Sequence, residues 1–177
     1  MIRLIVDKLS DGHKDIFLKF DSAPTEVKIV DSYYLFDFLE ISDTELESVD
    51  LKRMKEFEFR EIIIEENSIL ISVAKKLIDF WIERIKEIKK GETRFIPFDL
   101  SDEYIGGLLL EKNKMGFIIK QVYTTKIQGC EGLRKSNLDD LILERSVSFD
   151  IIEEEIVFIG EDALFAGLEW SKNELTY

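Results

Sequence analysis

Histidine and cysteine, the side chains most often used for nucleophilic and metal chemistry, occur once each in this chain, as His13 and Cys130. A single imidazole excludes a multi-histidine metal site within one chain and argues against a His-dependent triad. His13 lies in residues 10–14, a turn-like run typical of a surface loop. Cys130 has glycine neighbours, and its usual imidazole partner would have to be His13 from across the fold. We therefore expect no enzymatic activity and no resident metal or cofactor.

Carboxylates are abundant enough for acid–base or Mg²⁺ chemistry, since 37 of the 177 residues are Asp or Glu. With so many acids some pair is always adjacent, so adjacency alone identifies no site. Residues 43–47 have alternating acids, but they lack the glycine and the closing acid of an EF-hand loop, and we expect no calcium site. A metal-dependent hydrolase that uses a carboxylate pair is kept as an alternative function.

Glycine-rich phosphate-binding loops are absent, because the sequence contains no Walker motif and no dinucleotide fingerprint. Gly106 and Gly107 stand together inside an apolar run. This pattern predicts a bulge or a close backbone contact within a strand.

Charge is the most informative feature of the sequence. The 24 Lys and Arg residues against 37 Asp and Glu give a net charge of −13, which opposes direct binding to nucleic acid. Residues 31–50 hold seven acids and no Lys or Arg, interleaved with four Tyr and Phe. Because such dense like charge is repulsive by itself, the segment predicts contact with a basic protein partner. The candidate contact residues are Tyr33, Tyr34, Asp37, Glu40, Asp43, Glu45, Glu47 and Asp50.

A structural interpretation of the same segment is left open. In it, Phe36 and Phe38 face the core and the acids form a solvated rim. The acidic run at residues 153–155 is interpreted as a solvated turn.

Length and composition predict a single globular domain over residues 1–177, with 45% hydrophobic and 34% charged residues. A lone thiol suits a reducing compartment, so we expect a cytoplasmic protein. The first residues are apolar over too short a distance for a signal peptide, and no run reaches the length of a membrane span.

Short alternating segments predict strands at residues 3–6, 15–20 and 26–30. From residue 68 to 90 apolar side chains recur every three and four residues, which predicts one long amphipathic helix. Ser68 can cap its start and Gly91 can close its end. Residues 57–65 are ambiguous, and the alternation of Phe57 and Phe59 favours a strand there.

The second half of the chain predicts strands at residues 94–99, 104–111 and 115–124, with a hairpin at 112–114. A short helix is expected from residue 136, strands at 147–151 and 155–159, and a closing helix at 161–170. Trp81 and Trp170 are expected to pack in the core. Strands and helices do not alternate regularly, so the fold class is α+β: a mostly antiparallel sheet with one long amphipathic helix and one or two shorter ones.

The chain resembles the immunity proteins of bacterial polymorphic-toxin and contact-dependent growth inhibition systems. The resemblance is one of overall character, and it is closest from Leu77-Ile78-Asp79-Phe80-Trp81 through residues 96–107. It implies a protein that binds one cognate toxin domain in the cytoplasm of the producing cell and blocks it, over the active site or beside it. Many such toxins are basic nucleases that cleave tRNA or DNA. No family motif assigns individual residues, so the contact residues above come from charge and aromatic clustering.

A nuclease carries Lys and Arg to hold phosphates, and an inhibitor gains by presenting carboxylates to the same groups. The expected partner is therefore a basic toxin domain, with no membrane and no nucleic acid bound directly. Homodimerisation is left open. A structural or adaptor subunit is a further alternative, which predicts an exposed apolar strand or helix.

Overall fold

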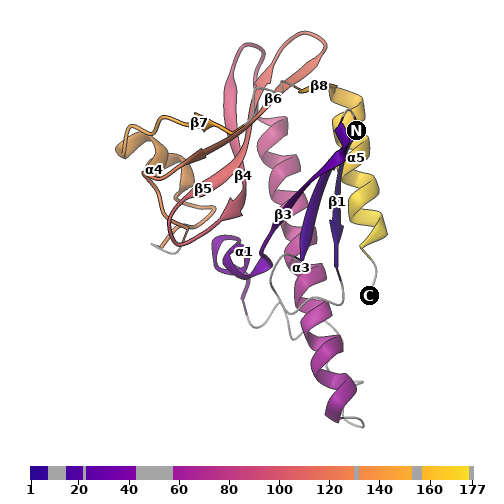
Figure 1. Ribbon diagram of the computed structural model, residues 1–177. Helices are drawn as coiled ribbons and strands as arrows, with labels where there is room; N and C mark the ends of the chain where they lie inside the picture. The colour runs from indigo at the N-terminus through magenta and orange to yellow at the C-terminus, as the bar shows by residue number, and fades with distance from the viewer. Residues whose placement is uncertain (8–14, 22, 43–57, 130–131, 153–156, 176–177) are drawn as a thin grey trace.

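Two antiparallel sheets and a long helix form the structure. The computed structural model describes residues 1–7, 15–21, 23–42, 58–129, 132–152 and 157–175 (Figure 1). Strands β1 to β3 and helix α1 come first, followed by α3, strands β4 to β6, α4, β7, β8 and α5. The predicted α+β class is confirmed, and every strand pair in the described part is antiparallel.

The first sheet has the order β1-β2-β3, formed by β1 (Ile2–Val6), β2 (Ile16–Phe20) and β3 (Ala23–Val30). Alternation sorts its side chains, because Ile2 and Leu4 pair with Phe20 and Leu18 and all four are buried. Pro24 lies within β3, an edge strand, where a residue without a backbone N–H is tolerated.

Helix α3 (Glu58–Lys86) contacts α1, α5, β1 and β4. Its predicted apolar stripe is buried from Leu70 to Ile85, with Trp81 1% exposed. The strand predicted at residues 57–65 is wrong, since α3 already begins at Glu58. Glu and Arg are good helix formers, and Ile62 and Ile63 follow Phe59 by three and four residues, which is also a helical spacing. Ser68 consequently lies inside the helix and does not mark its start, contrary to the prediction.

The second sheet is built from β4 (Thr93–Leu100), β5 (Ile105–Lys112) and β6 (Gly116–Thr124). Both β7 (Asp150–Ile151) and β8 (Val157–Gly160) pair with β6. The hairpin predicted between β5 and β6 is confirmed. A Cβ at Gly107 would lie 2.2 Å from the carbonyl oxygen of Ile96, and the β4–β5 register shifts between Pro97 and Asp99. The glycine pair therefore marks a close backbone contact beside a bulge, as predicted.

Three shorter helices complete the described chain: α1 (Ser32–Phe38), α4 (Leu138–Glu144) and α5 (Glu161–Glu174). The last two match helices predicted from the sequence, whereas α1 was not predicted. Trp170 on α5 was expected to pack in the core, but it is 40% exposed and its ring lies 5.4 Å from the guanidinium carbon of Arg3.

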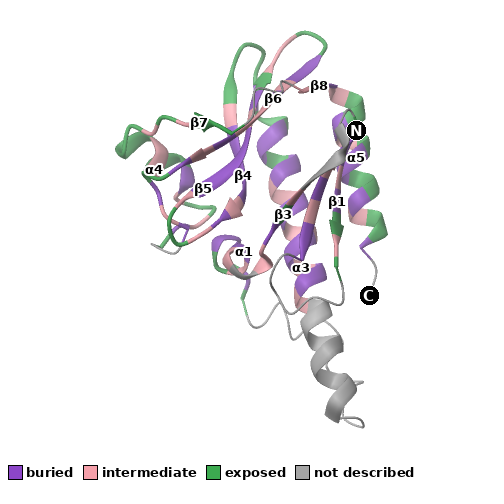
Figure 2. Ribbon diagram, viewed as in Figure 1, coloured by how far each residue is buried: buried purple, intermediate pink, exposed green. Residues whose placement is uncertain are grey.

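One cluster of buried apolar side chains draws on both sheets and on α1, α3 and α5 (Figure 2). Near its middle, Trp81 packs edge-to-face on Phe98 and donates its indole N–H to the carbonyl oxygen of Pro97 at 2.9 Å. Within the described ranges, no helix has the length and apolar character needed to cross a bilayer.

Candidate functional site

Helix α1 carries the described part of the acidic and aromatic segment. Its start is anchored by Asp15, a buried residue directly before β2, whose carboxylate accepts the backbone N–H of Ser32 at 2.8 Å and its hydroxyl at 2.6 Å. Leu35 and Phe38 are fully buried on one side of the helix. The carboxylate of Asp15 and the buried side chains of Leu35 and Phe38 together determine which face of α1 remains at the surface.

The structure places three of the predicted contact side chains on or beside α1. Asp37 and Glu40 are exposed, and Tyr34 packs against the core while staying partly accessible. Tyr33 lies within α1. The other predicted contacts and two residues considered for chemistry lie outside the described ranges: Asp43, Glu45, Glu47, Asp50, His13 and Cys130.

The structural interpretation of this segment agrees with the burial of Phe38 and with the packing of Phe36 against the core. The acids and the aromatic residues therefore point in different directions from α1. Burial of the rings holds the helix in place, and Asp37 and Glu40 stay exposed to solvent.

Glu40 ends the helix in a backbone conformation that disfavours most residues. Its φ is 55°, in the left-handed region where glycine is preferred. Its carboxylate accepts the hydroxyl of Ser136 at 2.9 Å. The backbone N–H of Lys135 also bonds the carbonyl oxygen of Phe38, so the loop that carries Lys135 lies beside the end of α1.

A second acidic and aromatic group comes from the turn between β4 and β5. The hydroxyl of Ser101 accepts the backbone N–H groups of Glu103 and Tyr104, both at 3.2 Å, which shapes the turn. The phenol of Tyr104 then donates to Asp99 at 3.1 Å and packs edge-to-face on Tyr123. The turn thus holds Asp99 against an aromatic pair.

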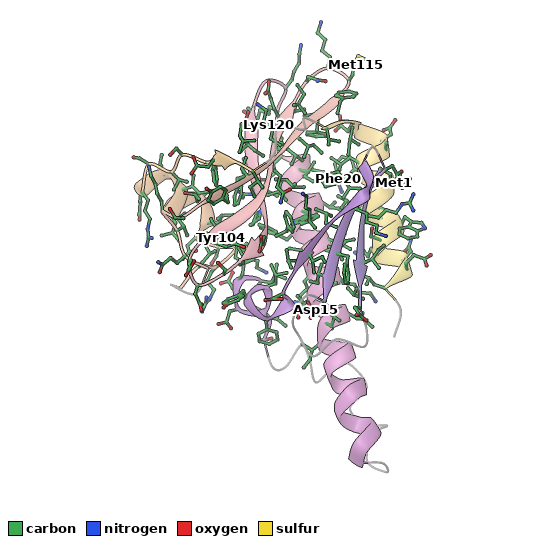
Figure 3. All side chains as sticks on the ribbon, in the orientation of Figure 1. Met1, Asp15, Phe20, Tyr104, Met115 and Lys120 are labelled. Atoms are coloured by element: carbon green, nitrogen blue, oxygen red, sulfur yellow. The ribbon has the colours of Figure 1, made fainter. Side chains whose placement is uncertain are left out.

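The two groups share one electrostatic environment, because Asp31, at the start of α1, acts on both Asp99 and Tyr104. Burial raises the pKa of Asp99 above its ordinary value, the hydrogen bond from Tyr104 opposes this, and the charge of Asp31 raises it further. Burial, followed by the charge of Asp99, raises the pKa of Tyr104 to about 12. Helix α1 contacts β4, and Figure 3 shows Tyr104 at the end of the second sheet that faces α1.

We use the name acidic surface for the carboxylates of these two groups. Three belong to the segment identified from the sequence, and three were missed because they lie in a different part of the chain. A signal was present, since residues 95–111 contain no Lys or Arg. The acidic surface consists of Asp31, Asp37, Glu40, Asp99, Asp102 and Glu103.

The acidic surface can bind cations borne on a protein partner, through charge-assisted hydrogen bonds to Lys or Arg. Within the described ranges, no three His, Cys, Asp or Glu side chains gather as a set of metal ligands. Comparison of the chain with models of protein families, with curated proteins and with solved structures finds no match in any of the three.

Proposed function

We propose that this chain is an inhibitor of the immunity type, which binds a basic toxin domain through the acidic surface. The observation that supports this most directly is the convergence of two acidic segments, about 60 residues apart along the chain, where α1 contacts β4. Four of their carboxylates are exposed: Asp37, Glu40, Asp102 and Glu103.

The chemistry of a nuclease partner suits this surface. Lys and Arg side chains that hold phosphates can form the same charge-assisted hydrogen bonds with carboxylates. The partly exposed rings of Tyr34 and Tyr104 supply the amphipathic area that interfaces favour. Long-range attraction raises the association rate, which benefits an inhibitor that has to capture its toxin before the toxin acts.

The raised pKa of Asp99 adds a dependence on pH. A Lys or Arg that approaches Asp99 favours its ionised form, so binding is expected to release a proton from the fraction of Asp99 that is still protonated. Affinity therefore falls as the pH is lowered through the pKa of Asp99.

Co-expression of the tagged chain with the product of the neighbouring upstream gene tests the proposal. We expect a one-to-one complex with a basic protein that is toxic when expressed alone, with an association rate that decreases as salt is added. Failure to retain any partner even at low salt would count against an inhibitor. A metal-dependent hydrolysis assay on the chain alone then becomes the discriminating measurement for the hydrolase alternative.

Charge reversal locates the interface. Asp37→Lys with Glu40→Lys is expected to slow association at least tenfold at low salt and to have little effect at high salt. The matched control is Glu144→Lys with Asp162→Lys, two exposed acids on α4 and α5. An equal decrease of the association rate in both double variants would indicate a general effect of net charge and refute the assignment of the acidic surface.

The predicted contacts outside the described ranges have a test of their own. Reversal of Asp43, Glu45, Glu47 and Asp50 to Lys together is expected to slow association while leaving the fold largely intact. Unchanged binding at low salt would restrict the interface to the acidic surface.

A further inference from the structure

Basic side chains gather where the turn between α3 and β4 lies beside the hairpin between β5 and β6. Residues 86–94 and 111–116 together hold six Lys and Arg against three Glu, on a chain whose net charge is −13. The backbone N–H of Gly91 bonds the carbonyl oxygen of Lys112 at 2.8 Å, and the N–H of Lys112 bonds the carbonyl oxygen of Glu92 at 3.0 Å. The two segments therefore lie side by side at one end of the second sheet (Figure 1).

Two of the three glutamates in these segments are already engaged. Glu87 binds Arg94 at 2.6 Å, and Glu92 accepts the backbone N–H of Lys89 at 2.9 Å. Several lysines, in contrast, are exposed, and their ammonium groups contact no acid among the described residues. These lysines are Lys89, Lys90 and Lys114.

An exposed apolar side chain accompanies the lysines. Met115, at the turn of the hairpin, is 78% exposed. The side-chain oxygen of Asn113 accepts the backbone N–H groups of Met115 at 2.8 Å and Gly116 at 3.0 Å, which shapes the turn from within. We use the name basic end for Lys89, Lys90, Lys114 and Met115.

The second sheet separates the basic end from the β4–β5 turn of the acidic surface. Strand β5 leads from that turn, which carries Glu103, to the hairpin that carries Lys114. Its eight residues span about 25 Å, and Figure 3 shows Tyr104 and Met115 far apart along the sheet. Because the Debye length is about 8 Å at physiological salt, the two charged groups do not neutralise each other within one chain.

We propose that the basic end of one copy of the chain binds the acidic surface of a second copy. Lysine ammonium groups form charge-assisted hydrogen bonds with carboxylates. On the acidic surface, Asp37 and Glu103 are exposed and bind no cation among the described contacts. The partly exposed rings of Tyr34 and Tyr104 provide the aromatic contact that a methionine thioether favours. The acidic surface thus complements both the charge and the apolar side chain of the basic end.

The contact joins two different surfaces, so the copies associate head to tail. Each added copy brings a further basic end and a further acidic surface, and assembly continues beyond a dimer unless a ring closes. The net charge of −13 repels the copies at long range. The contact is therefore weak, and it is favoured at a salt concentration that screens this repulsion while adjacent charges still pair.

Sedimentation velocity of the purified chain tests the proposal in about 0.15 M salt, from micromolar to millimolar concentration. We expect the average mass to rise steadily with concentration and to return to that of the monomer in about 1 M salt, where the Debye length is about 3 Å. A wild-type chain that stays monomeric at every concentration, or that stops at a dimer, would overturn the proposal.

Neutral substitutions at either surface are expected to give a monomer with an unchanged circular dichroism spectrum. The basic-end variant carries Lys89→Gln, Lys90→Gln and Lys114→Gln. The acidic-surface variant carries Asp37→Asn and Glu103→Gln. A mixture of the two variants is expected to form a one-to-one complex and nothing larger, because each variant supplies the surface that the other lacks. A mixture that does not associate while both variants stay folded would refute the head-to-tail contact.

The matched control for the acidic-surface variant is Glu144→Gln with Glu174→Gln, two exposed acids on α4 and α5. This control removes the same number of charges elsewhere on the chain, so it is expected to assemble as the wild type does. Loss of assembly in the control would show that net charge, and not the acidic surface, governs association, and it would contradict the proposal.

Two other anionic surfaces are tested with a DNA duplex and with vesicles of phosphatidylserine and phosphatidylcholine. We expect the wild type to bind neither probe in about 0.15 M salt, because the rest of the chain is acidic. A monomeric wild type that binds either probe, with binding lost in the basic-end variant, would assign the lysines to phosphate groups and overturn the proposal.

Assembly occupies the acidic surface, so a toxin domain is expected to displace the second copy. This competition rests on the proposed function, whereas the assembly itself does not. The sedimentation experiments use the chain alone. Absence of assembly would therefore leave the proposed function standing, and absence of a toxin partner would leave the assembly standing.

Discussion

Ser171 on α5 accepts the backbone N–H of Leu4 on β1 through its hydroxyl, at 2.9 Å. The same hydroxyl donates to the carbonyl oxygen of Gly167 at 2.8 Å, and the side chain is fully buried. Strand β1 is an edge strand, so a side chain from a helix occupies a position that a further strand would otherwise take. This contact joins the C-terminal helix to the first strand of the chain.

Substitution Ser171→Ala is expected to leave the Leu4 N–H buried without an acceptor. We expect the free energy of unfolding to fall by about 1–3 kcal/mol, measured by denaturant titration. The control is Asn173→Ala on the exposed side of the same helix, with an expected change within about 0.5 kcal/mol. A Ser171→Ala effect no larger than that of the control would contradict the role of the hydroxyl.

Gly167 allows α5 to approach β1 closely. Its replacement by Ala is therefore expected to lower stability, whereas helix propensity alone predicts an increase. Ala in place of Gly inside a helix normally adds about 0.5–1 kcal/mol of stability. Here a Cβ would lie 2.2 Å from the carbonyl oxygen of Ile2, so Gly167→Ala is expected to remove about 1–3 kcal/mol. The exposed control Ala166→Gly is expected to show the ordinary propensity loss of about 1 kcal/mol. A gain in thermal stability for Gly167→Ala would disprove the close approach.

Arg84 on α3 binds Asp139 on α4 through both ends of its guanidinium, and its Nε donates to the carbonyl oxygen of Phe95 at 2.8 Å. The hydrogen bonds from Arg84 hold the pKa of Asp139 below its ordinary value, despite opposition from burial. Stabilisation by Asp139 is therefore present above the ordinary carboxyl pKa and is lost as the pH falls through the lowered value.

Substitution Asp139→Asn is expected to remove about 0.5–1 kcal/mol at neutral pH, a small effect because Asp139 is 60% exposed. The difference from the wild type should vanish in acid. Asp140→Asn is the matched control, because both acids lie in the first turn of α4 and only Asp139 contacts Arg84 among the described contacts. Equal effects of the two substitutions across pH would show that the helix dipole, and not Arg84, is responsible.

The sequence was sufficient to predict a helix or strand that is buried on one side only, because one-sided burial imposes a hydrophobic period. Alternation at residues 16–20 and spacing of three and four at 70–85 each report a single buried face, so the strands and the long helix were predictable. Helix α1 was not, because Asp15 anchors its start from a different part of the chain. The Asp99 group was missed for the same reason, since its neighbour Asp31 is brought close only by the tertiary fold.

Glu40 keeps a carboxylate at a position where glycine would be more stable. We expect Glu40→Gly to raise the free energy of unfolding by about 0.5–1 kcal/mol, because the left-handed backbone no longer opposes a Cβ. The same variant is expected to slow toxin association. Glu40→Gln keeps the Cβ and removes only the charge, so it should slow association without the gain in stability. A Glu40→Gly variant that is less stable than Glu40→Gln would contradict the proposed strain.

Asp99, like Glu40, is expected to favour binding while lowering the stability of the fold. The effect of Asp99 on stability depends on pH, which distinguishes it from that of Glu40. Its folded pKa is raised, so the fold disfavours the ionised form: this penalty is absent below the ordinary carboxyl pKa and is complete above the folded pKa. Asp99→Asn should therefore stabilise the chain at neutral pH, and the gain should shrink in acid. Because the amide oxygen can still accept the phenol of Tyr104, the turn is expected to persist.

The same Asp99→Asn variant is expected to bind the toxin domain more slowly and with a weaker dependence on pH, since the titrating carboxylate is gone. Tyr104→Phe serves as the control that removes the hydrogen bond while keeping the charge, and it should keep the pH dependence of binding. If Asp99→Asn were instead less stable at neutral pH and bound the toxin as fast as the wild type, Asp99 would be a structural residue of the β4–β5 turn. A gain in stability together with slower association would mean that the chain keeps a partly buried charge at the expense of its own stability, which is expected of a residue retained for contact with a cationic partner.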